Sequence, residues 1–357
     1  MTQKNYANIV LNSLPEREME IVGQITAEKM SLLREKALQK VKAEIEIDGF
    51  RKGNAPETLV AQKVGEMRLL EEAAEIALSE EYPNILEEHN IDAIGRPEIT
   101  VTKIGLGAPL EFKVKTALLP SVKLGDYKKI AAIENKKEVG TTEISEKEID
   151  DTVLNIRRNM AHQMMHEKGG SGANEHSHGE IKDEDLPPID ENFLKVVGDF
   201  KSEADLREKI RQNIGKEKEM KERDKRRTDI LEKIMAESKI EMPKIIVEGE
   251  LQKMLAQFKD DLSRSGVPYE EYLKHIKKSE DDLKKDWRET AEKRAKSQII
   301  LNTVAKDENI APKEEDIKKE MENILANFKD ADRFRVRMYV ETLLTNDLVF
   351  KFLEEQK

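Results

Sequence analysis

The sequence contains no cysteine. Disulfide bonds and cysteine-ligated zinc sites are therefore excluded, and the composition fits a reducing compartment. The N-terminus has no charged-then-apolar signal segment, and no apolar run approaches the ~20 residues needed to cross a bilayer. We expect a cytoplasmic protein with no membrane partner.

Aromatic residues are also scarce, at 4% of the 357 residues, whereas charged residues make up 38%. A chain of this length holds two or three domains, each with a sizeable core. The high content of charge predicts many helices with large solvated faces rather than one compact globule. We therefore predict an elongated molecule.

An excess of positive charge is missing as well, because the formal net charge is −11. A general nucleic-acid binder needs a basic face that neutralises phosphates, so DNA is not an expected partner. Residues 1–119 alone carry 15 Lys and Arg against 20 Asp and Glu. Any contact with RNA must therefore be local.

One short stretch is locally basic, the segment 47–56 with the sequence Ile-Asp-Gly-Phe-Arg-Lys-Gly-Asn-Ala-Pro. Its tip consists of Gly49, Phe50, Arg51, Lys52 and Gly53. Glycines supply unusual backbone angles and the proline pre-sets the entry to a new helix, so the pattern predicts a solvent-facing loop. Two cations and one ring suit a surface of phosphates or acidic side chains. The alternative is an ordinary solvated turn.

The residues around this loop predict an α+β domain over residues 1–119. Period-two alternation over residues 5–25, broken near Pro15, predicts a hairpin, and residues 99–116 predict a second one. Thr26 is the expected N-cap of a helix that reaches about Ile45. After the loop, a helical stripe interrupted at Gly65 predicts two more helices. The loop lies at the far end of the helices that it joins.

The sequence in the middle of the chain predicts an extended linker followed by a segment that contains a helix and a long loop. Residues 120–142 read as an extended linker, and residues 143–187 as a helix followed by a flexible Gly/His-rich loop. Ser145 and Glu148 form the expected capping box of that helix. Four histidines there have a spacing that could chelate a divalent metal, although no cysteine or convergent carboxylate fixes the geometry. They are His162, His166, His176 and His178. A solvated linker is the favoured interpretation, so no metal is expected.

Residues 188–357 predict an all-α body with helical arms, in which Ser279 with Asp282 is the expected cap of one long helix. The apolar stripes of this body recur at helical spacing, and such stripes are usually core. Narrow helices with few aromatics are nevertheless expected to leave some apolar faces open, and methionine-bearing faces repack around different partners. The candidate substrate-binding residues are Met235, Met242, Leu251, Met254, Phe258, Met321, Phe328 and Met338.

The loop tip, with Ala55 and Pro56 after it, resembles the signature of the trigger factor family of ribosome-associated chaperones. The family usually has a lysine at the position of Asn54, so one cation is missing here. The resemblance covers most of the chain as an order of domains, and it is specific only at the tip. It implies that the loop contacts the large ribosomal subunit beside the exit tunnel, and that the helical body encloses a cradle.

The chain departs from the family between the linker and the body. Family members typically carry there a peptidyl-prolyl isomerase domain of about 100 residues, an ordinary domain size, with an aromatic pocket for proline. Only residues 161–187 separate the preceding helical segment from Pro188, and no Phe, Tyr or Trp occurs between Lys128 and Asn192. We therefore expect this domain to be absent.

These observations predict an ATP-independent chaperone that docks at the ribosome and shields nascent or unfolded polypeptides. No enzyme activity and no cofactor are expected, since no nucleotide-binding glycine loop is present. A weak homodimer is left open. The alternatives are a prolyl isomerase, which lacks its domain, and a non-ribosomal helical scaffold or holdase resembling the periplasmic porin chaperones.

Overall fold

The structure is a computed structural model that describes residues 4–48, 50–137, 143–168 and 186–357. The chain forms two compact units. The first comprises Met1–Gly125 and Ile234–Val349, and the second comprises Asp126–Lys233 and Phe350–Lys357. No helix in the part of the chain described here combines the length and the apolar character needed to span a bilayer.

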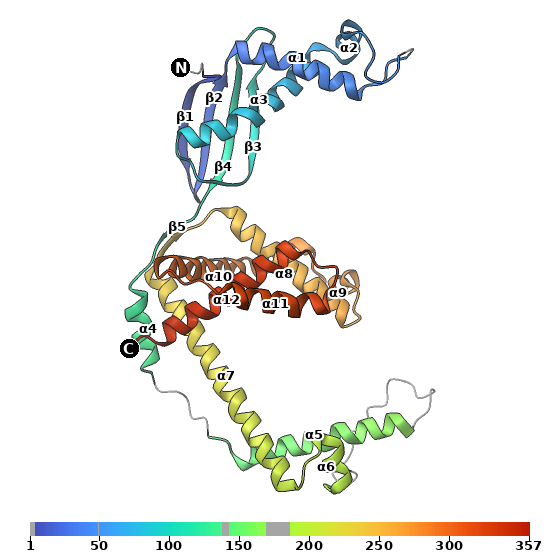
Figure 1. Ribbon diagram of the computed structural model, residues 1–357, viewed down its shortest axis with the longest axis vertical. Helices are drawn as coiled ribbons and strands as arrows, with labels where there is room; N and C mark the ends of the chain where they lie inside the picture. Colours follow the sequence, from blue (N-terminus) through green and yellow to red (C-terminus); the bar gives the residue numbers. More distant parts are fainter. Residues whose placement is uncertain (1–3, 49, 138–142, 169–185) are drawn as a thin grey trace. The chain divides into compact units, whose positions relative to one another are not determined.

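The N-terminal part of the first unit is an antiparallel sheet packed against helices (Figure 1). The sheet has the strand order β1-β2-β4-β3. Its strands are β1 (Tyr6–Leu14), β2 (Glu18–Ile25), β3 (Ala93–Lys103) and β4 (Leu110–Leu118). The helices between the two hairpins are α1 (Ala27–Glu44), α2 (Glu57–Val64) and α3 (Glu66–Glu88).

The main core of this domain lies between the two central strands and the helices α1 and α3. Ile21 of β2 and Phe112 of β4 are almost fully buried there against Leu33 of α1 and Ala77 of α3. The hydroxyl of Thr26 accepts a hydrogen bond from the backbone N–H of Lys29 at 3.3 Å, which confirms the predicted N-cap of α1. Every second residue of these strands points toward the helices, and these residues meet the apolar faces of α1 and α3 in one core.

The C-terminal part of the first unit consists of helices. These helices are α8 (Lys244–Arg264), α9 (Tyr269–Ile276), α10 (Glu280–Asp307), α11 (Glu314–Asn327) and α12 (Arg333–Glu354), of which the last leaves the unit at Val349. Leu251 of α8 and Ala291 of α10 form one small core, and Ile317 of α11 and Val340 of α12 form another. A capping box between Ser279 and Asp282 starts α10, as the sequence predicts.

Two short strands that the sequence did not predict join distant parts of the first unit. They are β5 (Ser121–Lys123) and β6 (Lys239–Glu241), which pair antiparallel. The hydroxyl of Ser238 also accepts a hydrogen bond from the backbone N–H of Gly125 at 3.1 Å. The chain therefore leaves the first unit after Gly125 and re-enters it beside the same point.

In the described residues of the second unit, all regular secondary structure is helical. Its helices are α4 (Tyr127–Asn135), α5 (Glu146–Lys168), α6 (Glu191–Gly198) and α7 (Glu203–Glu237). Phe193 of α6 is buried between Ile149 of α5 and Leu206 of α7. The Ser145 and Glu148 hydrogen bonds confirm the capping box predicted for α5.

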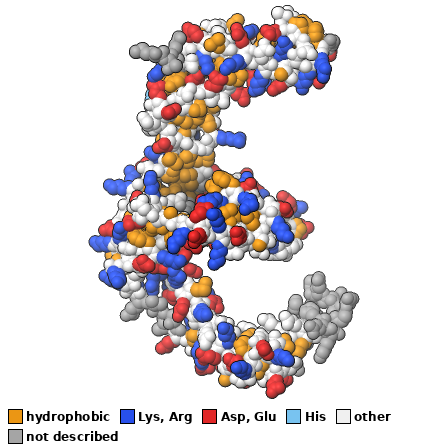
Figure 2. Space-filling model, viewed as in Figure 1, with side chains coloured by type: hydrophobic (Ala, Val, Ile, Leu, Met, Phe, Trp, Pro, Cys, Tyr) orange, Lys and Arg blue, Asp and Glu red, His pale blue; other side chains and the backbone are white. Residues whose placement is uncertain are grey.

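The predicted fold class is confirmed, because an α+β N-terminal domain precedes a helical body. The predicted linker 120–142 differs in detail, since it contains β5 and α4. Asp126 caps α4 by accepting a hydrogen bond from the N–H of Lys129 at 3.1 Å, so nine residues suffice for a capped helix. Side chains of both charge signs are mixed over the visible surface (Figure 2).

Candidate functional site

The loop between α1 and α2, residues 47–56, is folded by two tight turns. The backbone N–H of Phe50 donates to the carbonyl of Ile47 at 3.0 Å, and the N–H of Asn54 donates to the carbonyl of Arg51 at 2.9 Å. Gly53 adopts φ +84°, a left-handed angle that favours glycine. We call residues 47–56 the docking loop; its Gly49 lies outside the described residues.

The docking loop is supported by a core of its own. Val60 of α2 and Leu69 of α3 are fully buried there together with Ala55 of the loop and Leu38 of α1. Ile47 packs against this cluster from the start of the loop. The Lys63 ammonium also donates to the backbone carbonyl of Glu46 at 2.7 Å. The loop therefore has a fixed base, separate from the main core.

The predicted contact residues of the docking loop point into solvent. The side chain of Phe50 is 42% exposed, and Arg51 and Lys52 are exposed as well. Neither Arg51 nor Lys52 forms an ion pair with another residue that the structure describes. The tip thus presents one ring and two cations, the combination that binds acidic or phosphate-bearing surfaces.

Two cations of α1, the helix before the docking loop, are already paired with carboxylates. The guanidinium of Arg34 makes two hydrogen bonds to Glu66, and these lower the pKa of the Glu66 carboxyl. The ammonium of Lys40 donates to Glu72 at 2.5 Å, which raises the pKa of Lys40. These charges are neutralised within the domain, whereas those of Arg51 and Lys52 remain available to a partner.

Most of the predicted substrate-binding residues pack inside the helical body. Leu251 is fully buried, and Met242 and Met254 pack against its core. Phe258 contacts the rings of Tyr272 and Trp287 edge-on, at centroid distances of 5.1 and 5.3 Å. These apolar contacts therefore hold α8 against α9 and α10.

The remaining predicted residues are divided between core and surface. Met321 packs against the core of α11 and α12, and Met235 is half-buried on α7. Phe328 and Met338 are 59% and 53% exposed. Phe328 and Met338 are therefore the two of the eight whose side chains are most open to a bound polypeptide.

The largest exposed apolar side chains of α12 were not predicted. Together with Phe328 and Met338 they form a surface that we call the arm face, consisting of Phe328, Phe334, Met338, Tyr339 and Leu343. Phe334 is 70% exposed. The residues at 334 and 338, and at 339 and 343, are four apart, so each pair shares one side of α12. The first pair lies opposite the buried Val336 and Val340, and the second pair lies beside them. Spacing alone could not have found them, because the buried Val336 and Val340 recur at the same interval of four residues.

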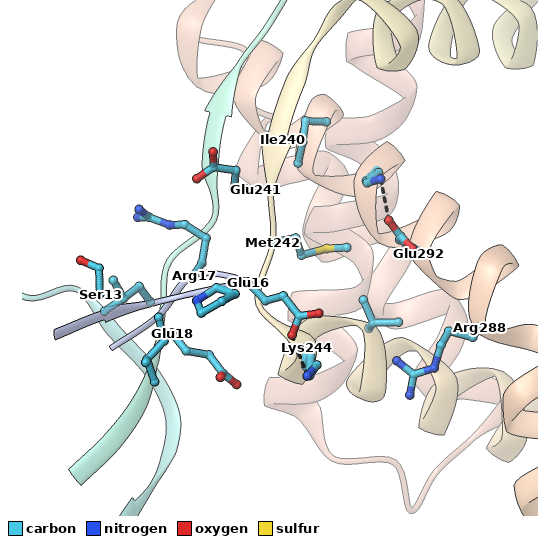
Figure 3. Close-up of a pocket in the computed structure, with 15 residues that line it drawn as sticks. Ser13, Glu16, Arg17, Glu18, Ile240, Glu241, Met242, Lys244, Arg288 and Glu292 are labelled. Atoms are coloured by element: carbon cyan, nitrogen blue, oxygen red, sulfur yellow. Dashed lines mark hydrogen bonds and ion pairs between the residues drawn. The ribbon is translucent and has the colours of Figure 1, made fainter. Parts of the chain in front are cut away.

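A cavity of about 670 Å³ lies in the first unit beside the turn between β1 and β2 (Figure 3). Its lining is of mixed charge. Lys244 pairs with Glu16 at 2.7 Å and Lys296 pairs with Glu292 at 2.6 Å, so these four groups neutralise one another.

The histidine-rich segment falls largely outside the described residues. His176 and His178 lie there, and of His166 only the backbone, within α5, is described. His162 lies on α5. Among the described residues, no group of three or more potential metal ligands comes together.

Family models match two long stretches of the chain. The model described as "Bacterial trigger factor protein (TF)" matches residues 7–156, and the one described as "Bacterial trigger factor protein (TF) C-terminus" matches residues 203–357. The stretch between them is much shorter than a typical domain of about 100 residues. The chain thus spans both matched regions and lacks the region of the isomerase domain.

Curated relatives and a solved structure agree with these matches. Trigger factor of Carboxydothermus hydrogenoformans is 27% identical, with 88% of this chain and 90% of the relative covered. Trigger factor of Moorella thermoacetica is 24% identical, with 96% and 92% covered. A solved structure from work on "Promiscuous Substrate Recognition in Folding and Assembly Activities of the Trigger Factor Chaperone" shares the fold, with a TM-score of 0.54, 17% identity, and 98% and 100% covered. The chain belongs to the bacterial trigger factor family.

Proposed function

We propose that this protein is an ATP-independent chaperone that docks on the large ribosomal subunit near the exit tunnel and shields nascent or unfolded chains. Membership of the trigger factor family supports the chaperone role. The proposal rests on the observation of two different surfaces in one chain. One is the docking loop, which is cationic and has a fixed base, and the other is the arm face, which is apolar and exposed. The first suits a defined partner and the second suits many.

Docking rests on the docking loop. Arg51 and Lys52 can bind phosphates or carboxylates, and the ring of Phe50 can bury apolar area beside them. The separate core under the loop fixes its conformation before binding, so little ordering entropy is lost on contact. Asn54 stands where the family usually has a lysine, and one fewer cation favours fast exchange over tight binding.

Holding of unfolded chains rests on the arm face. Large exposed apolar patches on soluble proteins mark interaction sites. Three aromatic side chains, one methionine and one leucine form the patch, and such flexible apolar surfaces select on hydrophobicity rather than on sequence. We propose weak and multivalent contacts as the source of affinity, with no nucleotide cycle.

Prolyl isomerase activity is not part of the proposal. The region that would hold the isomerase domain is missing, and α5, α6 and α7 instead close on a small core of their own. An isomerase needs an apolar pocket for the proline ring. The proposed activity therefore depends on the docking loop and the arm face alone.

Suppression of aggregation tests the holding activity. An unfolded protein is diluted from denaturant, and its light scattering is followed with this chain or with Phe334→Ser/Met338→Ser/Tyr339→Ser. We expect the parent to suppress scattering at molar excess and the variant to suppress it less. The matched control is Val196→Ser/Met220→Ser, which removes exposed apolar side chains from α6 and α7. A parent that fails to suppress scattering would remove the holding claim.

A non-ribosomal scaffold or holdase is the competing function. It differs from the proposal in its partner, since it would bind one stoichiometric protein rather than ribosomes. A pull-down from a lysate that yields such a partner, with no ribosomal protein, would favour the scaffold.

A further inference from the structure

The sheet of the N-terminal domain is wider than its helices can cover. Ile99 of β3 pairs with Val114 of β4, and Val101 pairs with Phe112. Residues directly opposite each other on paired strands share a face, so Ile99 and Val101 belong to the face that packs on α1 and α3. Val114 and Phe112 are buried, but Ile99 and Val101 are 46% and 41% exposed.

A groove of about 670 Å³ runs between this uncovered strip of β3 and the helix α3. Leu78 and Tyr82 line it from α3, and Ile99, Val101 and Ile104 line it from β3 and the residue after it. β3 is also an edge strand, so one side of its backbone has no strand partner among the residues that the structure describes. The groove can therefore receive apolar side chains next to a backbone edge that can pair with an extended peptide.

The polar rim of the groove is acidic. Glu71 and Glu75 line it from exposed positions on α3, and no lysine or arginine is among the described lining residues. Glu71 lies 3.6 Å from the guanidinium of Arg68, and that pair is itself exposed. Exposed pairs of this kind exchange partners at little cost. The rim therefore complements cations carried by a ligand.

We propose that this groove is a second binding site for unfolded polypeptide, specific for extended apolar segments flanked by lysine or arginine. The arm face lacks such an acidic rim, because exposed Arg333, Arg335 and Asp332 all lie within two residues of Phe334 and their charges are mixed. The site rests on the proposed function only in taking an unfolded chain as its ligand.

Site-specific crosslinking tests the site, since the chain has no cysteine of its own. Ser79→Cys places a photo-crosslinker at the groove. Thr100→Cys is the matched control, because Thr100 pairs with Lys113 on the other face of the sheet. Thr342→Cys, which is exposed on α12 near the arm face, reports on the proposed holding activity. The probes are two peptides with the same leucine- and valine-rich centre and either lysine or glutamate at both ends.

We expect the lysine-flanked peptide to crosslink at position 79 and not at position 100, with binding about three to ten times tighter than that of the glutamate-flanked peptide at low salt. Ile99→Thr/Val101→Thr keeps strand-favouring residues and should weaken binding about tenfold through lost apolar contact. Glu71→Gln/Glu75→Gln should remove the preference for lysine. A circular dichroism spectrum equal to that of the parent shows that each variant folds.

The outcomes separate this site from the proposed function. Crosslinking at position 342 but not at position 79 would overturn the groove while leaving the holding activity intact. No crosslinking at either position would overturn both. A crosslink from position 79 to a second copy of the chain, without peptide, would overturn the peptide site and replace it with self-association.

Discussion

The docking loop and the arm face both place aromatic rings beside arginine, but they do so in different ways. The loop has one ring and two cations, fixed by two turns and a core of four buried residues. The arm face has two rings and two long apolar side chains on α12, and a third ring, Phe328, directly after α11. A fixed single anchor suits one partner geometry, whereas a broad flexible face suits many. The predictions below test whether these two constructions behave differently.

A substitution in the core under the docking loop should give the largest effect, a loss of stability. Leu69→Ala removes a fully buried side chain from this small cluster and should lower the free energy of unfolding by about 2–4 kcal/mol. Leu59→Ala, at a 40% exposed position of α2, should cost far less. Urea denaturation measures both. Equal effects of the two variants would show that the loop has no distinct core.

The C-terminal end of α12 should be acid-sensitive, in contrast to the apolar base of the loop. Burial alone would raise the pKa of Glu354, but hydrogen bonds from Arg223 and Arg227 lower it to about 2. The folded pKa thus lies below the ordinary value of about 4.3, so the stabilisation is complete above about pH 5 and is lost as the pH falls toward 2.

Glu354→Gln tests the interaction of Glu354 with Arg223 and Arg227 in the second unit. The variant should lower the free energy of unfolding at pH 7 by about 1–2 kcal/mol, because two charged hydrogen bonds are lost. Its stability should then vary less than that of the parent between pH 5 and pH 2. Thermal unfolding across this range is the measurement, and parallel pH profiles for both proteins would contradict the account.

Gly53 should matter for the shape of the docking loop rather than for packing. A Cβ at this position would meet no atom within 4 Å, so the cost comes from φ +84° alone. Gly53→Ala should cost about 1 kcal/mol, and Gly53→Asn should cost less because asparagine tolerates left-handed angles. Ribosome affinity should fall in the same order. A larger loss for asparagine than for alanine would refute a backbone effect.

A change of salt concentration should give the smallest effect, and it should affect the two surfaces differently. Binding through Arg51 and Lys52 should weaken several-fold when the salt concentration rises from 50 to about 200 mM, because exposed charges are screened. Suppression of aggregation by the arm face should hold or improve, since apolar contacts are not screened. Titration of both activities at the two salt concentrations checks this, and an equal salt response would remove the distinction.

The sequence predicted those features that depend on local chemistry. Helix starts at Thr26, Ser145 and Ser279 carry capping residues whose hydrogen bonds need only the next turn, and the docking loop carries its glycines and proline. The short helix α4 was missed, because its nine residues lie in a stretch whose weak apolar pattern reads as an extended linker.

The arm face and the groove depend on long-range packing, so the sequence could not place them. Periodicity identifies the apolar stripe of a helix, but it does not tell which apolar residues a neighbouring helix covers. Leu251 and Phe334 both read as apolar helical positions, yet the first is fully buried and the second is 70% exposed. Ile99 likewise follows the strand pattern of a core residue, and only the width of the sheet leaves it open.

Cosedimentation with ribosomes tests the central claim most directly. The parent is compared with Phe50→Ala/Arg51→Ala/Lys52→Ala and with the matched control Met220→Ala/Lys221→Ala/Lys225→Ala, which removes one apolar side chain and two cations from exposed positions of α7. We expect the parent and the control to pellet with ribosomes and the loop variant to stay in the supernatant. A loop variant that pellets as well as the parent would contradict the account.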